Sequence, residues 1–258
     1  MTDHIRIGVE DRVMRIALNR PDKKNAITNA MYAALGNALD SAEKDPQVRA
    51  VLLEAEGDAF TAGNDLADFA AVASGQLARS DMKSHMFLNA LARAEKPIVA
   101  AVQGFAVGIG VTMLMHCDLV FVAENARLST PFVNLALVPE AASSWLIPAR
   151  IGHARAFQMF ALGEPVGGRT AAAIGLVNAA VPVDQVRAKA LEAARALATR
   201  PLGALQATKK LMRDAAAISA VMQREGEIFG QRLKTAEAAE AFRAFAERRA
   251  PDFSKISG

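Results

Sequence analysis

The sequence predicts an α/β fold, with a core of alternating strands and helices followed by a mostly helical C-terminal part. Short apolar runs rich in Val, Ile and Leu alternate with segments of helical periodicity in the first half of the chain. From Pro139 onward, helical periodicity dominates. Apolar residues make up 52% and charged residues 22% of the 258 residues, a balance that allows a substantial buried core.

Most of the expected strands lie in the first half of the chain, at 6–9, 13–18, 50–54, 97–102, 119–123 and 127–129. Between the second and third strands, Thr28 is expected to cap a helix that Asp45 and Pro46 end. Tight loops of small residues follow two buried strands, at 59–65 and 104–110, and the second loop is expected to open a helix. An alanine-rich helical stretch, interrupted near Ser74 and Gly75, is expected after the first loop.

The second half of the chain is expected to be helical at 145–151, 154–162, 170–174 and 183–198, with two long stretches from Gly203 onward. The segment from about 202 to 249 carries long apolar stripes, which usually pack on the same protein or on a second subunit. We therefore expect residues 1–200 to form the core with the functional site. Residues 201–258 are expected to form a helical region for oligomerisation.

Composition and charge exclude several classes of function. The 30 Lys and Arg residues against 27 Asp and Glu residues suit an anionic small molecule and are far from a nucleic-acid polycation. Cys117 is the only cysteine, so an intramolecular disulfide and a paired-cysteine metal cluster are excluded. The uncharged segment 97–117 is long enough to span a bilayer, but Gln103, several glycines and His116 interrupt it. Neither nucleic acid nor membrane is an expected partner, and with no signal-peptide pattern the expected localisation is cytoplasmic.

The common cofactor and catalytic templates are missing. The sequence has no Gly-x-x-x-x-Gly-Lys-Ser/Thr loop, no Gly-x-Ser-x-Gly elbow and no metal-type spacing of its four histidines. Gly108 and Gly110 begin a dinucleotide-type pattern, but Met113 takes the place of its third glycine. No metal and no separate cofactor is therefore expected.

Two small-residue loops, 60–65 and 104–110, and an acidic residue at a helix start, Glu140, remain as candidates. Small residues let a ligand carbonyl approach main-chain N–H groups, and the N-terminal end of a helix favours an anion. Taken singly, each loop is only a turn. As a pair accompanied by an acid, they indicate an oxyanion hole facing a base.

Four blocks in order resemble the crotonase family of enoyl-CoA hydratases and isomerases, over about residues 6–253. They are Asn19-Arg20-Pro21 with Asn25-Ala26, the loop 60–66, the segment 103–108 with Cys117-Asp118, and the closing 245–249. The resemblance implies a crotonase-like spiral of ββα units and a helical C-terminal trimerisation region that also closes the CoA pocket. It implies an acyl-CoA thioester substrate, with CoA as part of the substrate, and a homotrimer or dimer of trimers.

The resemblance also implies roles for individual residues. The main-chain N–H groups of Ala62 and Ile109 would hold the thioester oxygen. The substrate and CoA contacts would come from Lys24, Asn25, Ala26, Ala62, Gly63, Asn64, Asp65, Leu66, Phe132, Phe229 and Arg248. Phe229 and Arg248 match positions that often serve a neighbouring subunit.

The reaction is indicated by which acids the chain retains. A hydratase needs two carboxylates to activate and place a water, and the matching positions hold Thr112 and Phe132. The block 137–144, with Pro139-Glu140, resembles the peroxisomal-type Δ3,Δ2-enoyl-CoA isomerases, in which this glutamate is the base. One carboxylate over C2 and C4 can both remove and return a proton. The prediction is a Δ3,Δ2-enoyl-CoA isomerase with Glu140 as its single acid/base.

Several alternatives stay open. Pro139 suits a first helical position, so Glu140 could simply complement a helix dipole. The chain could be an enoyl-CoA hydratase with an atypical acid, or a ring-forming or ring-opening isomerase of aromatic-degradation CoA esters. Outside enzymes, a non-catalytic crotonase-fold scaffold or an RNA-binding relative is the remaining alternative.

Overall fold

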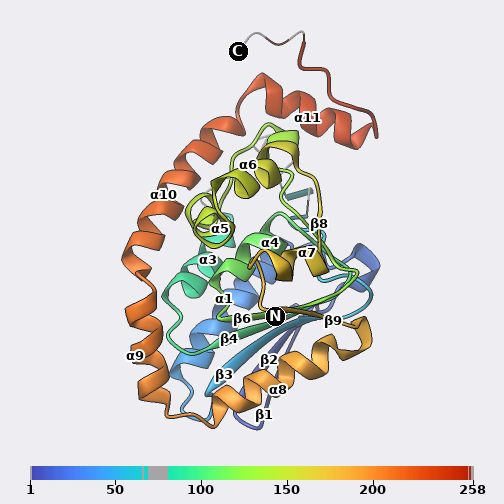
Figure 1. The fold of residues 1–258 in the computed structure, drawn as a ribbon. Helices are drawn as coiled ribbons and strands as arrows, with labels where there is room; N and C mark the ends of the chain where they lie inside the picture. Colours follow the sequence, from blue (N-terminus) through green and yellow to red (C-terminus); the bar gives the residue numbers. More distant parts are fainter. Residues whose placement is uncertain (1, 66, 69–80, 255, 257–258) are drawn as a thin grey trace.

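A six-stranded sheet in the order β1-β2-β3-β4-β6-β9 forms the centre of the molecule (Figure 1). The computed structural model describes residues 2–65, 67–68, 81–254 and 256. β1 (Ile5–Glu10) pairs with β2 (Val13–Leu18) in an antiparallel hairpin. β2, β3 (Ala50–Ala55), β4 (Ile98–Val102), β6 (Leu119–Ala123) and β9 (Ala179–Val181) are parallel. The predicted α/β class is confirmed.

Helices cover both faces of this sheet, as buried parallel strands require. Every residue of β3 and β4 is buried. α8 (Val186–Ala198) packs on one face, and α1 (Asn29–Lys44) and α3 (Ser84–Arg93) lie on the other (Figure 1). As predicted, α1 begins after Thr28, whose hydroxyl accepts the Met31 N–H, and it ends at Asp45.

A smaller sheet lies beside the first and carries the second small-residue loop. It contains β5 (Phe105–Val107), β7 (Arg127–Ser129) and β8 (Val166–Gly167). The sequence did not predict β5, β8 or β9. Strands of two or three residues barely show a strand period, and of these short strands only β7 was predicted. Pairing with neighbouring strands makes them extended.

Shorter helices connect the two sheets. They are α4 (Ile109–Thr112), α5 (Ser143–Ile151), α6 (His153–Leu162), α7 (Gly168–Ala173) and the 3-10 turns η1 (Pro21–Lys23), η3 (Met113–His116), η4 (Val133–Leu135) and η5 (Val183–Gln185). The uncharged segment 97–117 thus contains the predicted strand, β4, and the predicted helix start, α4, and in addition β5 and the 3-10 turn η3. None of the helices in the described ranges is both long and apolar enough to cross a membrane.

Three helices form the C-terminal region, where the sequence predicted two long stretches. α9 (Leu202–Met212), α10 (Ala215–Arg232) and α11 (Ala236–Ala246) run along one side of the molecule and past its upper end (Figure 1). Asp214 caps α10 by accepting the Ala217 N–H, and Thr235 caps α11 by accepting the Ala238 N–H. These two caps divide the region. The boundary near residue 200 stays a prediction, and so does the helix interruption near 74–75, which falls outside the described residues.

Candidate active site

A cavity of about 470 Å³ lies between α1, α3 and α10 and opens onto the loop that follows η4. Its lining mixes apolar and hydrogen-bonding side chains, including Tyr32, Asn64, His85, Glu140, Met222 and Phe229. Glu140 is the only carboxylate among the described residues that line this cavity. The structure therefore places the predicted acid in a pocket of the size expected for a small-molecule site.

Glu140 lies in the turn between η4 and α5, outside any helix. Because α5 begins three residues later, at Ser143, the side chain does not occupy the first turn of a helix. The alternative of a helix-dipole role is therefore wrong. Ala141 and Ala142 have φ angles of 59° and 57°. Consecutive left-handed residues other than glycine are costly, and such conformations cluster at functional sites.

The Glu140 carboxyl has a pKa suited to proton transfer at neutral pH. Burial raises the pKa of Glu140 to about 7, a hydrogen bond from Thr112 acts to lower it, and the charge of Glu225 raises it further. Thr112 Oγ1 donates to Glu140 Oε1 at 2.5 Å. A carboxyl group with this pKa is populated in both protonation states near pH 7, which is what a group that takes and returns a proton needs.

The two positions where a hydratase would carry carboxylates are occupied differently. Thr112 is fully buried and uses its hydroxyl on Glu140. Phe132 packs against Phe160, with ring centroids 6.2 Å apart, and is not among the described residues lining the cavity. The expectation that Phe132 contacts the substrate is therefore not met in this structure, because its ring points into the core.

The two small-residue loops lie side by side. Thr61 forms a parallel bridge with Ala106, and Val107 N–H donates to Thr61 O at 3.1 Å. Gly63 has a φ of 91°, and a Cβ on it would lie 2.8 Å from Val107 O. A Cβ on Gly110 would lie 2.5 Å from Thr61 Cγ2. Glycine at both positions is what allows this close approach.

The main-chain N–H groups of these loops differ in availability. Ala62 N–H donates to Lys24 O at 2.9 Å, so it is already committed within the protein. This finding contradicts the prediction that Ala62 supplies an oxyanion donor. By contrast, the N–H groups of Asn64 and Ile109 have no acceptor among the described residues. Ile109 opens α4, as the sequence analysis expected.

The predicted CoA-contacting residues 24–26 and 62–65 are joined by hydrogen bonds between their loops. Thr61 Oγ1 donates to Asn25 O at 2.6 Å, and Ile27 N–H donates to Gly63 O at 2.8 Å. Arg20 Nη1 donates to Asp65 Oδ2 at 2.5 Å. Asn25 is fully buried, and its side-chain amide donates to two carbonyls of the loop at 56–59. Asn25 therefore holds the loops together, and its side chain is not available to a ligand.

The remaining predicted contacts are distributed unevenly. Phe229, on α10, lines the cavity. Arg248 lies beyond the end of α11 and does not belong to the cavity lining. Lys24 is half exposed and pairs with Asp58 at 2.8 Å. Leu66 lies outside the described residues.

Tyr32 is a site residue that the sequence analysis missed. It lies on α1, is 2% exposed, lines the cavity, and donates from its hydroxyl to Asn64 Oδ1. Burial raises the pKa of Tyr32 well above its ordinary value, with the charge of Glu140 adding to the shift, so the phenol stays protonated. The signal was the single tyrosine of the chain lying on the apolar side of a predicted helix.

Two other residues, His116 and Cys117, are buried. His116 is buried, hydrogen-bonded to Ala141 O through Nε2 at 2.8 Å, and held neutral because burial and Arg213 lower its pKa to about 3. Burial raises the pKa of Cys117 to about 12, which makes this thiol unreactive. Within the described ranges, no group of three or more His, Cys, Asp and Glu side chains could hold a metal ion.

Comparison with known proteins decides the family. A sequence model described as "Enoyl-CoA hydratase/isomerase" matches residues 8–256. The chain belongs to the enoyl-CoA hydratase/isomerase family. This family acts on acyl-CoA thioesters, so the chain is an enzyme of that kind.

Individual relatives differ in the reaction that they are named for. The chain is 32% identical to the 2,3-dehydroadipyl-CoA hydratase of Escherichia coli, over 96% of this chain and 97% of that protein. It is 34% identical to the enoyl-CoA delta isomerase 2 of Rattus norvegicus, over 95% of this chain and 64% of that protein. A crystal structure of an enoyl-CoA hydratase/isomerase from Pseudoalteromonas atlantica superposes with a TM-score of 0.92 at 40% identity, covering 97% of this chain and all of the other. The crotonase-like fold is thus confirmed, while the names leave the reaction open.

Proposed function

We propose that this enzyme is a Δ3,Δ2-enoyl-CoA isomerase in which Glu140 is the single acid/base. The observation that carries the proposal is that Glu140 is the only carboxylate among the described residues lining the cavity. A double-bond shift needs one group that removes and returns a proton. Hydration needs two groups that share the work of activating and placing a water.

In the proposed reaction one side chain, Glu140, both removes and returns the proton. The Glu140 carboxylate takes a proton from C2 of a 3-enoyl thioester, and the electrons of the broken C–H bond move into a dienolate. Protonated Glu140 then delivers the same proton to C4, and the double bond ends between C2 and C3. A pKa of about 7 leaves Glu140 strong enough to take the proton and weak enough to release it.

The negative oxygen of the dienolate is proposed to bind the free N–H groups of Asn64 and Ile109. Their loops are in direct contact through the bridge between Thr61 and Ala106. Neither N–H has an acceptor among the described residues, so both are available to a ligand. Each preorganised donor of this kind lowers a barrier by roughly 3 to 4 kcal/mol.

Hydratase activity, the alternative, is disfavoured by what surrounds Glu140. Thr112 occupies the first hydratase position and donates to the Glu140 carboxylate. A second carboxylate there would lose this hydrogen bond and place a like charge beside Glu140. At the second position, the ring of Phe132 is buried against Phe160.

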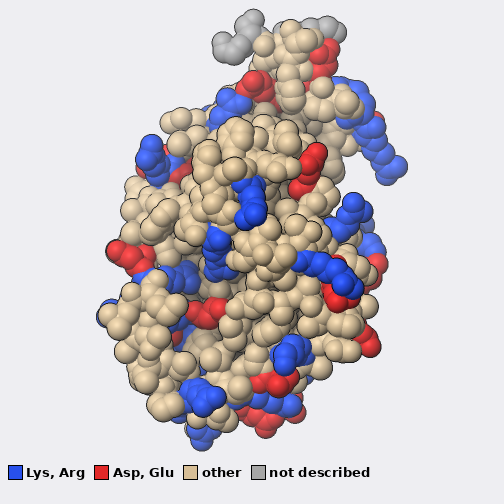
Figure 2. Space-filling view, viewed as in Figure 1, with Lys and Arg blue, Asp and Glu red and all other residues tan. Residues whose placement is uncertain are grey.

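We also propose that the enzyme uses no cofactor, and that CoA takes part only as a portion of the substrate. Its contacts are proposed at Lys24, at the main chain of residues 25–26 and 62–65, and at Phe229. Lys and Arg are mixed with Asp and Glu over the face drawn in Figure 2, so binding of the CoA phosphates would depend on local side chains such as Lys24.

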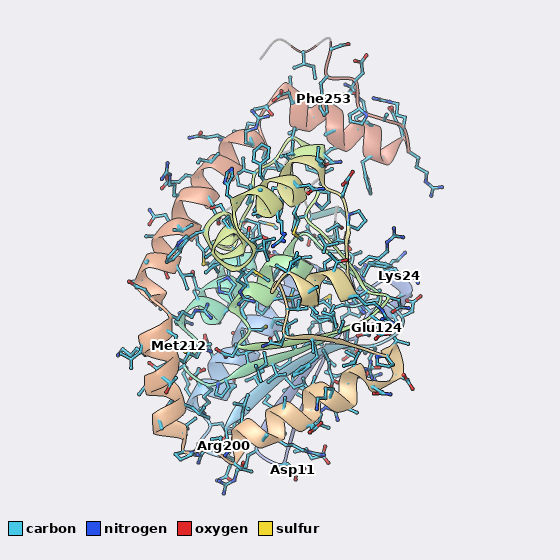
Figure 3. The ribbon with its side chains drawn as sticks, in the orientation of Figure 1. Asp11, Lys24, Glu124, Arg200, Met212 and Phe253 are labelled. Carbon is cyan, nitrogen blue, oxygen red and sulfur yellow. The ribbon has the colours of Figure 1, made fainter. Side chains whose placement is uncertain are left out.

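Assembly into a trimer or a dimer of trimers stays part of the proposal. Leu211 and Met212, at the end of α9, are 89% and 82% exposed. Met212 lies at the outer edge of the molecule (Figure 3). Large apolar side chains this exposed and adjacent indicate a surface that a second copy covers. Arg248, which does not line the cavity of its own chain, would then serve a neighbouring subunit.

The proposal is tested by Glu140→Gln, which keeps the size of the side chain and can still accept a hydrogen bond from Thr112. Turnover of a 3-enoyl-CoA to the 2-enoyl product is expected to fall by about 10²- to 10⁴-fold, the usual contribution of a general acid/base. Glu164→Gln, at an exposed residue outside the cavity lining, is the matched control and should keep its activity.

Two results would contradict the proposal. The first is turnover of Glu140→Gln within a few-fold of the unsubstituted enzyme. The second is a wild-type enzyme that hydrates a 2-enoyl-CoA faster than it isomerises a 3-enoyl-CoA. Binding of CoA measured by calorimetry should be the same in both variants, which separates loss of chemistry from loss of binding.

A further inference from the structure

Glu225 is a buried carboxylate that contacts the turn carrying Glu140 from a distant part of the chain. It lies on α10 and is 6% exposed. Its Oε2 accepts the Ala142 N–H at 2.6 Å, and its Oε1 accepts the Ser144 N–H at 2.9 Å. Both carboxylate oxygens are therefore used on main-chain amides two and four residues after Glu140.

The turn at residues 140–144 needs such a partner. Ala141 and Ala142 both have left-handed φ angles, and no side chain of the turn itself caps α5. Left-handed residues with a Cβ persist only when the surroundings hold them. The first N–H groups of a helix also require an acceptor, which Glu225 supplies.

We propose that Glu225 is a positioning residue for Glu140: by holding the amides of Ala142 and Ser144, its carboxylate fixes the turn that directs the Glu140 side chain into the cavity. This inference rests on the proposed role of Glu140 as the acid/base. It assigns to the C-terminal helix α10 a part in the chemistry, in addition to lining the cavity.

A second contact restrains the same turn from the other side. His116, in η3, is bonded through Nε2 to Ala141 O at 2.8 Å. Because Arg213 donates to His116 Nδ1 at 2.5 Å, the proton of the neutral ring lies on Nε2 and points at the carbonyl. Arg213 directly precedes the cap of α10. The start and the middle of α10 thus both restrain the turn, one through His116 and one through Glu225.

Charge couples Glu225 to Glu140 as well. Burial is the main reason that the pKa of Glu140 is raised, and the negative charge of Glu225 adds to it. The pKa of Glu225 is itself raised by burial, which its hydrogen bonds to Ser144 and Ala142 oppose.

Three of the other described groups around Glu140 are uncharged. Tyr32 on α1 stays a protonated phenol, Thr112 on α4 is neutral, and His116 on η3 is neutral. His85 on α3 lines the cavity, and its Nδ1 donates to Met82 O at 2.6 Å. Glu225 is therefore the anion whose removal should change the pKa of Glu140 most.

The test is Glu225→Gln, with Glu227→Gln as the matched control. Glu227 lies on the same helix, is exposed, and accepts a hydrogen bond from Gln223. Glutamine at 225 removes the charge and can accept only one of the two amides. We expect kcat for the 3-enoyl thioester to fall by about 100-fold, the scale of a displaced catalytic group. Glu227→Gln should leave kcat unchanged.

The second readout does not depend on the reaction. The Glu140 carboxyl is titrated in the ligand-free protein by ¹³C NMR with labelled glutamate, and its signal is assigned from its absence in Glu140→Gln. In Glu225→Gln the Glu140 pKa should fall below about 7, because a like charge has been removed. A Glu225 that acted only as a cap or as a nearby charge would leave kcat unchanged even where this pKa falls, so the positioning role requires the loss of kcat as well as the shift.

The outcomes separate this inference from the proposed function. An unchanged Glu140 pKa with unchanged kcat in Glu225→Gln overturns the positioning role, whatever reaction the enzyme performs. Full activity of Glu140→Gln would instead overturn the proposed function and leave the measured coupling in place. If Glu225→Gln does not fold, Glu225→Asp keeps the charge but is too short to reach both amides. It should then lower kcat with a smaller change in the Glu140 pKa, and wild-type kcat in that variant would also overturn the inference.

Discussion

The hydrogen bond from Thr112 to Glu140 offers the most direct test of how the pKa of the acid/base is set. Thr112→Val replaces the hydroxyl by a methyl group of nearly the same size at a fully buried position. The Glu140 carboxylate then loses a donor at 2.5 Å, while the volume of the site changes little. Since this hydrogen bond favours the ionised form, its loss should raise the Glu140 pKa above about 7.

The size of the shift follows from the energy of the bond. A hydrogen bond to a charged group contributes about 1.5 to 3 kcal/mol, and each pKa unit corresponds to about 1.4 kcal/mol. The Glu140 pKa in Thr112→Val should therefore rise by about 1 to 2 units. At pH 7 the ionised fraction would fall from about one half to between about one tenth and one hundredth, a loss of about 5- to 50-fold in kcat/KM.

The assay is the pH dependence of kcat/KM for a 3-enoyl-CoA, which reports the pKa of the free enzyme's base. In the unsubstituted enzyme, kcat/KM should rise with pH with a midpoint near pH 7. In Thr112→Val this acidic limb of the pH profile should move to higher pH, so that activity recovers in alkaline buffer. Thr112→Ser keeps the hydroxyl and is the matched control. An acidic limb that stays in place in Thr112→Val, or that moves equally in Thr112→Ser, would refute the reasoning.

Two further predictions concern stability and the small-residue loops. Because folding raises the Glu140 pKa from 4.5 to about 7, the ionised carboxylate destabilises the fold above pH 7 and has no such cost below pH 4.5. Glu140→Gln should therefore stabilise the protein by about 3 kcal/mol at pH 8 and by little at pH 4, measured by chemical denaturation; equal effects at both pH values would contradict this. Gly63→Ala places a Cβ 2.8 Å from Val107 O at a φ of 91°, so it should lower stability by about 1 to 3 kcal/mol and reduce kcat by displacing the adjacent Asn64 amide. Gly8→Ala, where nothing lies within 4 Å, is its control, and similar losses in both variants would argue against a special role for the loop.

Local patterns in the sequence were sufficient to predict most of the core elements. The strands at 13–18, 119–123 and 127–129 have the predicted bounds, and α1 begins after Thr28. Apart from the three-residue strand at 127–129, these elements are long or strongly patterned, or they carry a cap residue that competes well with other local conformations. The division of the C-terminal region into three helices was readable in principle, because Asp214 and Thr235 are ordinary caps, but it was missed.

The roles of individual amides could not be read from the same patterns. Ala62 and Asn64 lie two residues apart in one small-residue loop, and the sequence gives no reason to prefer either as a donor. The carbonyl of Lys24 engages the Ala62 N–H, and this leaves the Asn64 N–H free. Similarly, Phe132 could face the substrate or the core, and only its packing against Phe160 shows that it faces the core.

The sequence by itself determined the α/β class, the two glycine-containing loops and Glu140 as the candidate acid, because each depends on residue type and on neighbours close in the chain. Only the tertiary structure decided how Glu140 behaves. Its pKa depends on burial, on Thr112 and on Glu225, and its direction depends on a turn held by His116 and Glu225. Glu225 lies 83 residues from the amide of Ala142 that it accepts. Hydrogen-bond partners and desolvation arise from groups that folding brings together, so no local pattern carries them.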